Sequence, residues 1–427
     1  MSSPHVVVAC HAWYADSIGG SFRLASELAE SLAANDCRVS YLCAGPADRD
    51  LPDREEVGEV VVYRYRPPDG SRLQRLRGHL RESVRLLARI HDDRPVNILT
   101  GHSPLQFHGA AKQARRLPDR AGLRTNFTVH SPFDDEITPV GGRIPLTTRL
   151  AIAIARRIDR ACCRLADVVQ TDSQYTLDVF RQRHRAAMLR DDGSFKGVVA
   201  PGWVDTATFR PADELAASKA ELRASLGSPW PGRGDDAGPV FFTLRRLEPR
   251  MGLEDLVDAA ATLKRDGRQF RVLIGGGGSL RESLDERIAA AGLTDTVVML
   301  GRIPEDSLAA SYAAADCFVL PTRALECFGL IVLEAFAAEV PVIAAAAAAI
   351  PELAEHQGRD WLFPPGNADA LADRMRRFLD GTLRPTQPLR EFATGYDRET
   401  VLERWRSLLL APREHSRPVA DAATASA

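Results

Sequence analysis

Short apolar runs rich in β-branched residues alternate with longer amphipathic segments along most of this chain, and this alternation limits its fold more than any other feature. The strand-like runs of the first half are residues 5–10, 38–43, 59–65, 96–101, 125–130 and 167–172. Helix-like segments lie between them, such as 20–35, in which Leu24, Leu28 and Leu32 share one face. Strands that alternate with helices form parallel sheets that are covered on both faces. The first half is therefore predicted to be a doubly wound α/β domain.

The same alternation starts again in the second half. Its strand-like runs are residues 240–244, 270–275, 296–300, 317–321 and 340–344. A chain of 427 residues can bury two separate cores, so we predict an N-terminal domain over 1–204 and a C-terminal domain over 205–387. A ligand is expected in the crevice between them. Residues 388–411 should form a C-terminal helix that packs back toward the N-terminal domain, and 412–427 a disordered tail.

Composition excludes several classes of protein. The content of 45% hydrophobic and 26% charged residues is typical of a soluble globular protein, and a net charge of −2 gives no general case for binding nucleic acid. No apolar run reaches the roughly 18 residues of a membrane span, and residues 1–10 lack the features of a signal peptide. The seven cysteines are scattered, with no CxxC pair and no zinc-type spacing. We therefore expect reduced thiols, no metal and a cytoplasmic location.

The stretch LECFGLIVLEAF (325–336) places two acids, Glu326 and Glu334, around seven uncharged residues. A helix is predicted to begin near Phe328–Gly329, where unpaired backbone N–H groups and the helix dipole favour an anion. Glu334 would then lie about one turn inside the helix, where a carboxylate can accept hydrogen bonds from a ribose diol. The alternative is that Glu326 is a surface acid and Glu334 a core acid paired with an arginine.

Two further segments suit phosphate groups. Arg245, Arg246 and Arg250 follow a strand of the second domain, and guanidinium groups bind phosphate oxygens in pairs of hydrogen bonds. Gly19 and Gly20 precede the first helix, a geometry that also admits a phosphate. The alternative for the arginines is an ordinary solvated surface. The chain lacks the GxGxxG spacing of NAD enzymes and the GxxxxGK[ST] pattern of P-loop proteins.

Several polar residues follow strands of the first domain. His130 ends the strand 125–130, so its imidazole could donate to or accept from a substrate hydroxyl. His102 and His108 carry a weaker form of the same hypothesis. Residues 134–136, which are Asp, Asp and Glu, are either acceptor ligands or part of a solvated loop. A structural role remains the alternative for each histidine.

Residues 71–95 form a basic helical stretch whose leucines fall on one stripe. Its first interpretation is a crossover helix whose arginines face water. The alternative is a surface that contacts anionic lipid at the inner face of a membrane. Residues 1–204 hold 29 basic and 24 acidic residues, and this excess of positive charge favours the alternative.

In order and spacing, these segments resemble glycosyltransferase family 4, retaining enzymes of the GT-B fold that use sugar nucleotides. The resemblance covers most of residues 5–380. It rests on the early glycine pair, on His130 and on the segments APGWVDTATFRP, LRRLEPRMGLEDLVDA, IGGGGSLRESL, MLGRIPEDSLAASYAAADCFVLPT and ECFGLIVLE. It implies two Rossmann-like domains that face a central cleft.

The resemblance also implies roles for particular residues. Glu326 would contact hydroxyls of the donor sugar and Glu334 the ribose, while the backbone at Phe328–Leu330 and the Arg246 side chain would bind the diphosphate. His130 would orient the donor sugar. The implied reaction is transfer from a UDP- or GDP-type sugar with retention at the anomeric carbon. The reaction would need no cofactor and no metal; the nucleotide sugar is itself a substrate. The acceptor would be a glycan, a lipid-linked sugar or a small molecule.

The chain departs from the family pattern at several positions. The phosphate-binding lysine of the family falls on Met251, for which Arg250 is the nearest substitute. Glycines of the pattern are replaced by Cys327, Glu339 and Ala348. Two other hypotheses therefore stay open. One is a non-catalytic relative that binds a nucleotide sugar or scaffolds a partner enzyme, and the other is a sugar-nucleotide epimerase.

Overall fold

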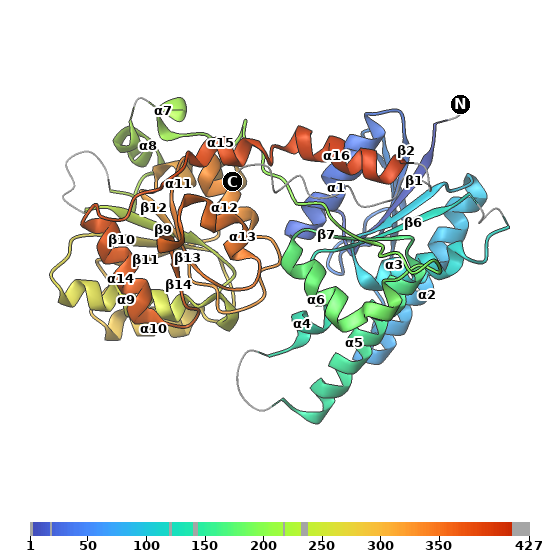
Figure 1. Cartoon of the computed structure of the whole chain (residues 1–427), viewed down its shortest axis with the longest axis horizontal. Coiled ribbons are helices and arrows are strands. Elements are labelled where there is room, and N and C mark those ends of the chain that lie inside the picture. Colours follow the sequence, from blue (N-terminus) through green and yellow to red (C-terminus); the bar gives the residue numbers. More distant parts are fainter. Residues whose placement is uncertain are drawn as a thin grey trace. The chain divides into compact units, whose positions relative to one another are not determined.

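The computed structural model describes residues 3–17, 19–118, 122–139, 144–216, 218–231 and 238–411. The predicted tail at 412–427 lies outside the described residues. Within them, the chain forms two compact units (Figure 1). Unit 1 comprises 3–139, 144–201 and 401–411, and unit 2 comprises 202–400.

Unit 1 is built on a nearly parallel sheet. Its strands are β1 (His5–Ala9), β2 (Arg38–Ala44), β3 (Arg54–Val57), β4 (Val60–Tyr65), β5 (Ile98–Gly101), β6 (Arg124–Val129), β7 (Val168–Thr171) and β8 (Gly197–Val199). They lie in the order β3-β4-β2-β1-β5-β6-β7-β8, and β3 runs antiparallel to β4. All six strands predicted for this half are confirmed. The sequence missed β3, because REEV has no apolar run, and β8, because it is only three residues long.

Helices cover the sheet of unit 1. They are α1 (Gly20–Ala33), α2 (Arg72–Asp93), α3 (Pro104–Ala114), α4 (Phe133–Ile137), α5 (Leu146–Leu165) and α6 (Gln174–His184). The helix α2 begins with a capping box formed by Ser71 and Gln74, packs on α3, and α3 packs in turn on α5. The buried apolar residues of α2 include Leu86, Leu87 and Ile90. The sequence segment 71–95 is therefore a crossover helix, as the first interpretation held.

Unit 2 is built on a second sheet, which is entirely parallel. Its strands are β9 (Val240–Leu244), β10 (Arg271–Gly275), β11 (Val297–Gly301), β12 (Cys317–Leu320), β13 (Val342–Ala345) and β14 (Leu362–Phe363). Their order is β11-β10-β9-β12-β13-β14. The central strand β9 has β10 on one side and β12 on the other, so the loops after these three strands meet at one edge of the sheet. All five predicted strands are confirmed, and the short strand β14 was missed.

Helices also flank the sheet of unit 2 (Figure 1). They are α7 (Ala212–Leu215), α8 (Lys219–Leu226), α9 (Leu253–Arg265), α10 (Arg281–Ala290), α11 (Glu305–Ala314), α12 (Leu330–Ala337), α13 (Ile350–Ala354), α14 (Ala368–Leu379) and α15 (Leu389–Thr394). The helix α9 packs against α10 and α14, while α12 packs against α11 and α15. The two doubly wound domains predicted from the alternation of strands and helices are therefore present.

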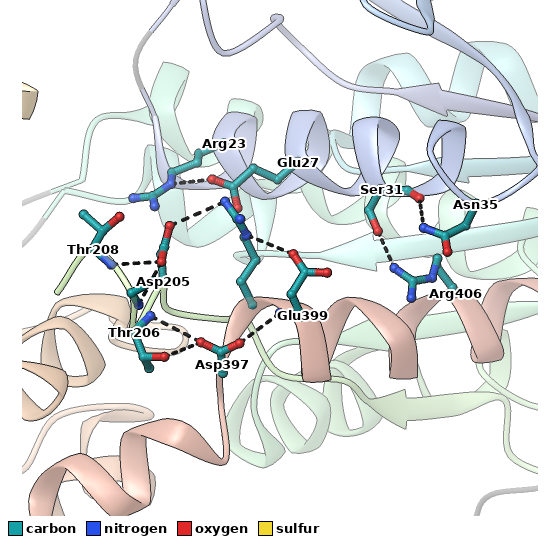
Figure 2. Close-up of polar contacts among 12 residues, drawn as sticks. Arg23, Glu27, Ser31, Asn35, Asp205, Thr206, Thr208, Asp397, Glu399 and Arg406 are labelled. Atoms are coloured by element: carbon teal, nitrogen blue, oxygen red, sulfur yellow. Dashed lines mark hydrogen bonds and ion pairs between the residues drawn. The ribbon is translucent and has the colours of Figure 1, made fainter. Parts of the chain in front are cut away.

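The predicted C-terminal helix is two helices, α15 and α16 (Arg398–Leu410). Asp397 interrupts them: its carboxylate accepts hydrogen bonds from Thr206 and from the backbone N–H of Glu399, near the start of α16 (Figure 2). The helix α15 belongs to unit 2 and packs on α12. The division between units falls at 201/202 and again at 400/401, inside α16.

The C-terminal part of α16 is bound within unit 1. Arg406 donates a hydrogen bond to the Ser31 hydroxyl on α1 (Figure 2). Arg124 donates to the Leu409 carbonyl at 2.8 Å, and Trp405 Nε1 donates to the Pro201 carbonyl at 2.9 Å. Residues 401–410 thus complete unit 1, although unit 2 separates them from the rest of it in sequence.

Two residues that replace family glycines adopt left-handed backbone conformations. Glu339 has φ +57° and follows α12, and Ala348 has φ +52°. The Val340 N–H donates to the Ala335 carbonyl and the Glu339 N–H to the Phe336 carbonyl, which is the hydrogen-bond pattern of a Schellman motif. A side chain in this conformation costs on the order of 1 kcal/mol. The backbone at Glu339 and Ala348 thus keeps a conformation that glycine would favour, and the two side chains make this conformation less favourable.

Candidate functional site

The stretch with two glutamates lies at the edge of the unit 2 sheet where β12 ends. The helix α12 begins at Leu330, and its N-cap Gly329 has φ +96°, a conformation that favours glycine. No side chain among the described residues caps this end of the helix. The first N–H groups of α12 are therefore directed toward the space before the helix, and they form an environment that suits an anion.

Glu334 lies inside α12 and is 9% exposed. The hydroxyl of Tyr312, a fully buried residue of α11, donates a hydrogen bond to Glu334 Oε2 at 2.7 Å. This contact gives one oxygen of the carboxylate a hydrogen-bond donor in a largely apolar setting. Sequence reasoning missed Tyr312, whose signal was a single aromatic residue in an alanine-rich helix. The predicted ribose acid is thus held in place from the core side.

Glu326 lies in the loop before α12 and is paired with an arginine. Arg245 Nη2 donates to Glu326 Oε2 at 2.9 Å, and the two side chains are 7% and 19% exposed. A Cβ built on Gly329 would lie 3.9 Å from Glu326 Cγ, so this acid is adjacent to the start of α12. Glu326 is thus a loop acid that is only partly exposed, and its carboxylate is paired with Arg245.

The three arginines after β9 differ in their environments. Arg245 is buried, Arg250 is half-buried and Arg246 is exposed. Arg250 Nη1 donates to the Leu325 carbonyl at 3.2 Å. Arg250 therefore supports the loop that carries Glu326, and Arg246 extends into solvent.

The glycine-rich turn after β10 packs directly on this strand end. Gly276 has φ +121°, and a Cβ there would lie 1.8 Å from the Arg245 carbonyl oxygen. The Arg245 N–H donates to the Gly275 carbonyl, and the Leu247 N–H to the Gly277 carbonyl. Glycine is required here for close packing of two loops, and this packing fixes the backbone of Arg245.

In unit 1, His130 belongs to a polar network at the ends of β5, β6 and β7. His130 Nδ1 lies 2.7 Å from Asp172 Oδ2, and His130 Nε2 lies 3.0 Å from His102 Nδ1. Since a carboxylate can only accept, His130 donates through Nδ1 and a neutral His130 accepts from His102 through Nε2. Both ring nitrogens of His130 are therefore engaged. Asp172 was missed, although it ends a predicted strand that pairs with the strand of His130.

The same network extends to α16. The His102 ring stacks on Trp405 with centroids 5.9 Å apart, and it is 3% exposed. Burial lowers the pKa of His102 well below its ordinary value, and the neighbouring His130 ring adds to this effect. His102 is thus a neutral structural residue between His130 and the C-terminal helix.

The other residues singled out in the first domain have separate positions. Gly19 is the N-cap of α1, and Gly20 is its first residue. Asp134 is fully buried and forms ion pairs with Arg156 and Arg183, at 2.6 and 2.8 Å. The hypotheses of an acceptor ligand and of a solvated loop are therefore both wrong for Asp134, which anchors α4 to α5 and α6.

Buried histidines make unit 1 sensitive to acid. Burial lowers the pKa of His108 and of His184 to about 4, and these side chains are 8% and 3% exposed. Below pH 6.5 the unfolded chain binds protons that the folded chain does not, so stability falls as the pH is lowered. Burial raises the pKa of Asp159, and this group acts in the opposite direction.

We expect the unfolding free energy of unit 1 to fall by about 1 kcal/mol for each of His108 and His184 between pH 7.5 and 5.5. Urea titrations followed by circular dichroism at the two pH values would measure this loss. His108→Leu should reduce the pH dependence. An unfolding free energy independent of pH in this range would contradict the prediction.

Within the described residues there is no group of three or more histidine, cysteine, aspartate or glutamate side chains placed to hold a metal ion. Nor does any helix of that part of the chain combine the length and hydropathy of a membrane span. The seven cysteines are free thiols, six of them buried.

Two family models match the chain. One, described as Glycosyltransferase Family 4, matches residues 18–188, and the other, described as Glycosyl transferases group 1, matches residues 231–393. Among curated proteins, GDP-mannose-dependent alpha-(1-6)-phosphatidylinositol monomannoside mannosyltransferase of Mycobacterium tuberculosis is 31% identical over 268 residues, which cover 61% of this chain and 64% of that protein. Alpha-D-kanosaminyltransferase of Streptomyces kanamyceticus is 28% identical over 243 residues, or 55% and 57% of the two chains. The chain thus matches less than two thirds of the length of either relative.

Solved structures share the fold across nearly the whole chain. Sucrose-phosphate synthase from Thermosynechococcus elongatus has a TM-score of 0.76 at 22% identity, over 95% of this chain and 98% of that one. HepE from Anabaena, solved in complex with UDP and glucose, has a TM-score of 0.70 at 19% identity, over 96% and 100%. At these identities the likeness concerns the fold alone, which is GT-B.

Proposed function

The chain belongs to glycosyltransferase family 4, and on this basis we propose that it transfers a sugar from a nucleoside-diphosphate sugar to an acceptor hydroxyl. One observation carries the proposal: Glu326, the uncapped start of α12 and Glu334 follow one another at the edge of the unit 2 sheet. An acid for the sugar, N–H groups for the diphosphate and an acid for the ribose succeed one another in the same order as the parts of such a donor.

The proposed catalysis is mainly electrostatic. As the bond to the anomeric carbon breaks, negative charge grows on the diphosphate oxygens and positive charge on the sugar ring. Fixed N–H groups at the start of α12 and neighbouring arginines would stabilise the leaving diphosphate. Glu326 would hold the sugar hydroxyls and favour the positively charged ring. We propose retention at the anomeric carbon from the family resemblance. Because helix and guanidinium groups supply the positive charge, we also propose that no metal is needed.

The proposed acceptor site belongs to unit 1. His130, held by Asp172 and His102, would orient the donor sugar toward the acceptor once it exchanges its contact with His102 for a sugar hydroxyl. The relatives named above include one whose name specifies a lipid-linked acceptor, phosphatidylinositol monomannoside. We propose a hexose-type donor and an acceptor that is a glycan, a lipid-linked sugar or a small molecule.

The helix α5 suits contact with a membrane surface better than α2 does. At its N-terminal end, Leu146 is 81% and Leu150 is 60% exposed, although both are large apolar residues. They lie one helical turn apart, with the exposed Arg149 beside them and Arg157 further along. Exposed leucines flanked by arginines fit an anionic lipid surface. We propose that unit 1 touches the membrane through this end of α5.

We expect the protein to sediment with vesicles that contain phosphatidylglycerol and to bind neutral phosphatidylcholine vesicles far less. Leu146→Ser with Leu150→Ser should weaken the binding by about 30-fold, since each leucine buries apolar surface worth roughly 1–2 kcal/mol. Leu73→Ser on α2 is the matched control and should bind like the unchanged protein. Equal binding of all three proteins would show that α5 is not the contact.

A panel of UDP-, GDP- and dTDP-sugars tests the function itself. The protein should bind at least one of them and catalyse its hydrolysis or its transfer to an added acceptor. Measurable nucleotide binding without turnover of any donor would favour the non-catalytic alternative. The neutral Met251 and the strained backbone of Ala348 are the observations that support this alternative. Isomerisation of the donor without an acceptor would identify an epimerase.

A further inference from the structure

The position at which the family pattern has a lysine is neutral and buried in this chain. Met251 ends a 3₁₀ turn at Pro249–Met251 and is 5% exposed. Its sulfur lies 2.9 Å from Arg245 Nη2. A thioether is only a weak acceptor, so this contact does not neutralise the guanidinium. A cationic group from another position in the sequence therefore lies at the end of the Met251 side chain.

Arg245 is held firmly at this place. Its side chain is 7% exposed, and the glycine-rich turn fixes its backbone. Nη2 donates to Glu326, while Nε is shielded from solvent and has no hydrogen-bond partner among the described residues. An unsatisfied buried donor on a charged group is costly, and an anionic oxygen that reached it would remove that cost.

The charge of Arg245 lies close to the proposed diphosphate position. Arg245 contacts Glu326, and Glu326 is adjacent to Gly329 at the start of α12. Arg250, the substitute expected from the sequence, instead donates to the carbonyl of Leu325. Arg246 extends into water, where its charge is screened. Of the three arginines, Arg245 alone combines burial with a contact to Glu326.

We infer that Arg245 supplies the positive charge that residue 251 lacks, so that it both holds Glu326 and binds the diphosphate of the donor. This inference rests on the proposed function. It accounts for the neutral residue at position 251, because a buried arginine lies beside the Met251 sulfur where the family pattern has a lysine. Residue 251 is neutral, and Arg245 carries the positive charge instead. The space between these two side chains is therefore still cationic.

The exchange can be reversed by mutation. Arg245→Gln should weaken the binding of UDP or GDP by about 30-fold, whichever the protein prefers, and leave the binding of the free nucleoside within about twofold. Met251→Lys alone should also weaken it, because two cations would then share one buried space. Arg245→Gly combined with Met251→Lys should restore binding to within about threefold of the unchanged protein.

Calorimetric titration with nucleoside diphosphate and nucleoside, alongside thermal unfolding, separates the outcomes. Arg287→Gln on the exposed face of α10 removes the same charge elsewhere in unit 2 and is the control. If Arg245→Gln fails to fold, Arg245→Lys keeps the charge and should retain most of the affinity. A loss equal for diphosphate and nucleoside, or no rescue in the double variant, would overturn the inference while the function stands. Failure of the unchanged protein to bind any nucleoside diphosphate would overturn both.

Discussion

Glu334→Ala will weaken the binding of UDP or GDP by about 100-fold. The carboxylate is expected to accept hydrogen bonds from both ribose hydroxyls, and charge-assisted bonds of this kind contribute roughly 1.5 kcal/mol each. In the structure Tyr312 holds this carboxylate in place on α12, so its position does not depend on the ligand. Calorimetric titration of the nucleoside diphosphate measures the effect.

The loss should be specific to ligands with a ribose. Pyrophosphate should bind the variant and the unchanged protein with similar affinity, because it contacts the start of α12 and the arginines alone. Glu282→Ala, on the surface of α10, is the matched control and should have no effect. A variant at Glu334 that bound UDP and GDP as the unchanged protein does would remove the ribose assignment.

Glu326→Gln is expected to act on turnover instead of on nucleotide binding. Its amide keeps the shape of the side chain but removes the negative charge that favours a positively charged sugar ring. We expect kcat to fall by on the order of 100-fold or more, while Kd for the nucleoside diphosphate changes by no more than about threefold. Single-turnover kinetics with the donor found in the panel would measure kcat separately from binding.

The neighbouring Arg245 makes this test sharper. The glutamine oxygen can still accept from Arg245, so the loop should remain folded and the thermal midpoint should change little. Asp306→Asn, at the exposed start of α11, is a control for the loss of an acid in unit 2. Unchanged kcat in Glu326→Gln would exclude this acid from the reaction.

The strands of both sheets could be predicted because buried parallel strands require continuous β-branched runs, and the sequence shows them plainly. The strand β3 could not, since its residues Arg54–Val57 are mostly charged and form an edge that pairs only with β4. The break at Asp397 was equally hidden. Asp397 accepts from the Glu399 N–H at the start of α16 and also from Thr206, almost two hundred residues earlier in the chain.

The part of the site that lies in one continuous segment of sequence could be predicted. The part formed by contacts between separate segments could be predicted less well. The start of α12 and the two glutamates follow from local sequence. The choice between Arg245 and Arg250 depends on packing of the glycine-rich turn against the end of β9, which no local pattern shows. The partners of His130, Asp172 and His102, come from the ends of two other strands, β7 and β5. Their sequence signals exist, but only the fold brings them together.

The contribution of α16 to unit 1 has a consequence for how the protein is made. Residues 202–400 are synthesised as one uninterrupted stretch, so unit 2 can fold as soon as they emerge from the ribosome. Unit 1 begins to emerge earlier, yet it lacks Trp405 and its neighbours until the whole of unit 2 has been translated. During that interval the His102 ring lacks its stacking partner. The domain that is synthesised first is therefore the domain that is completed last.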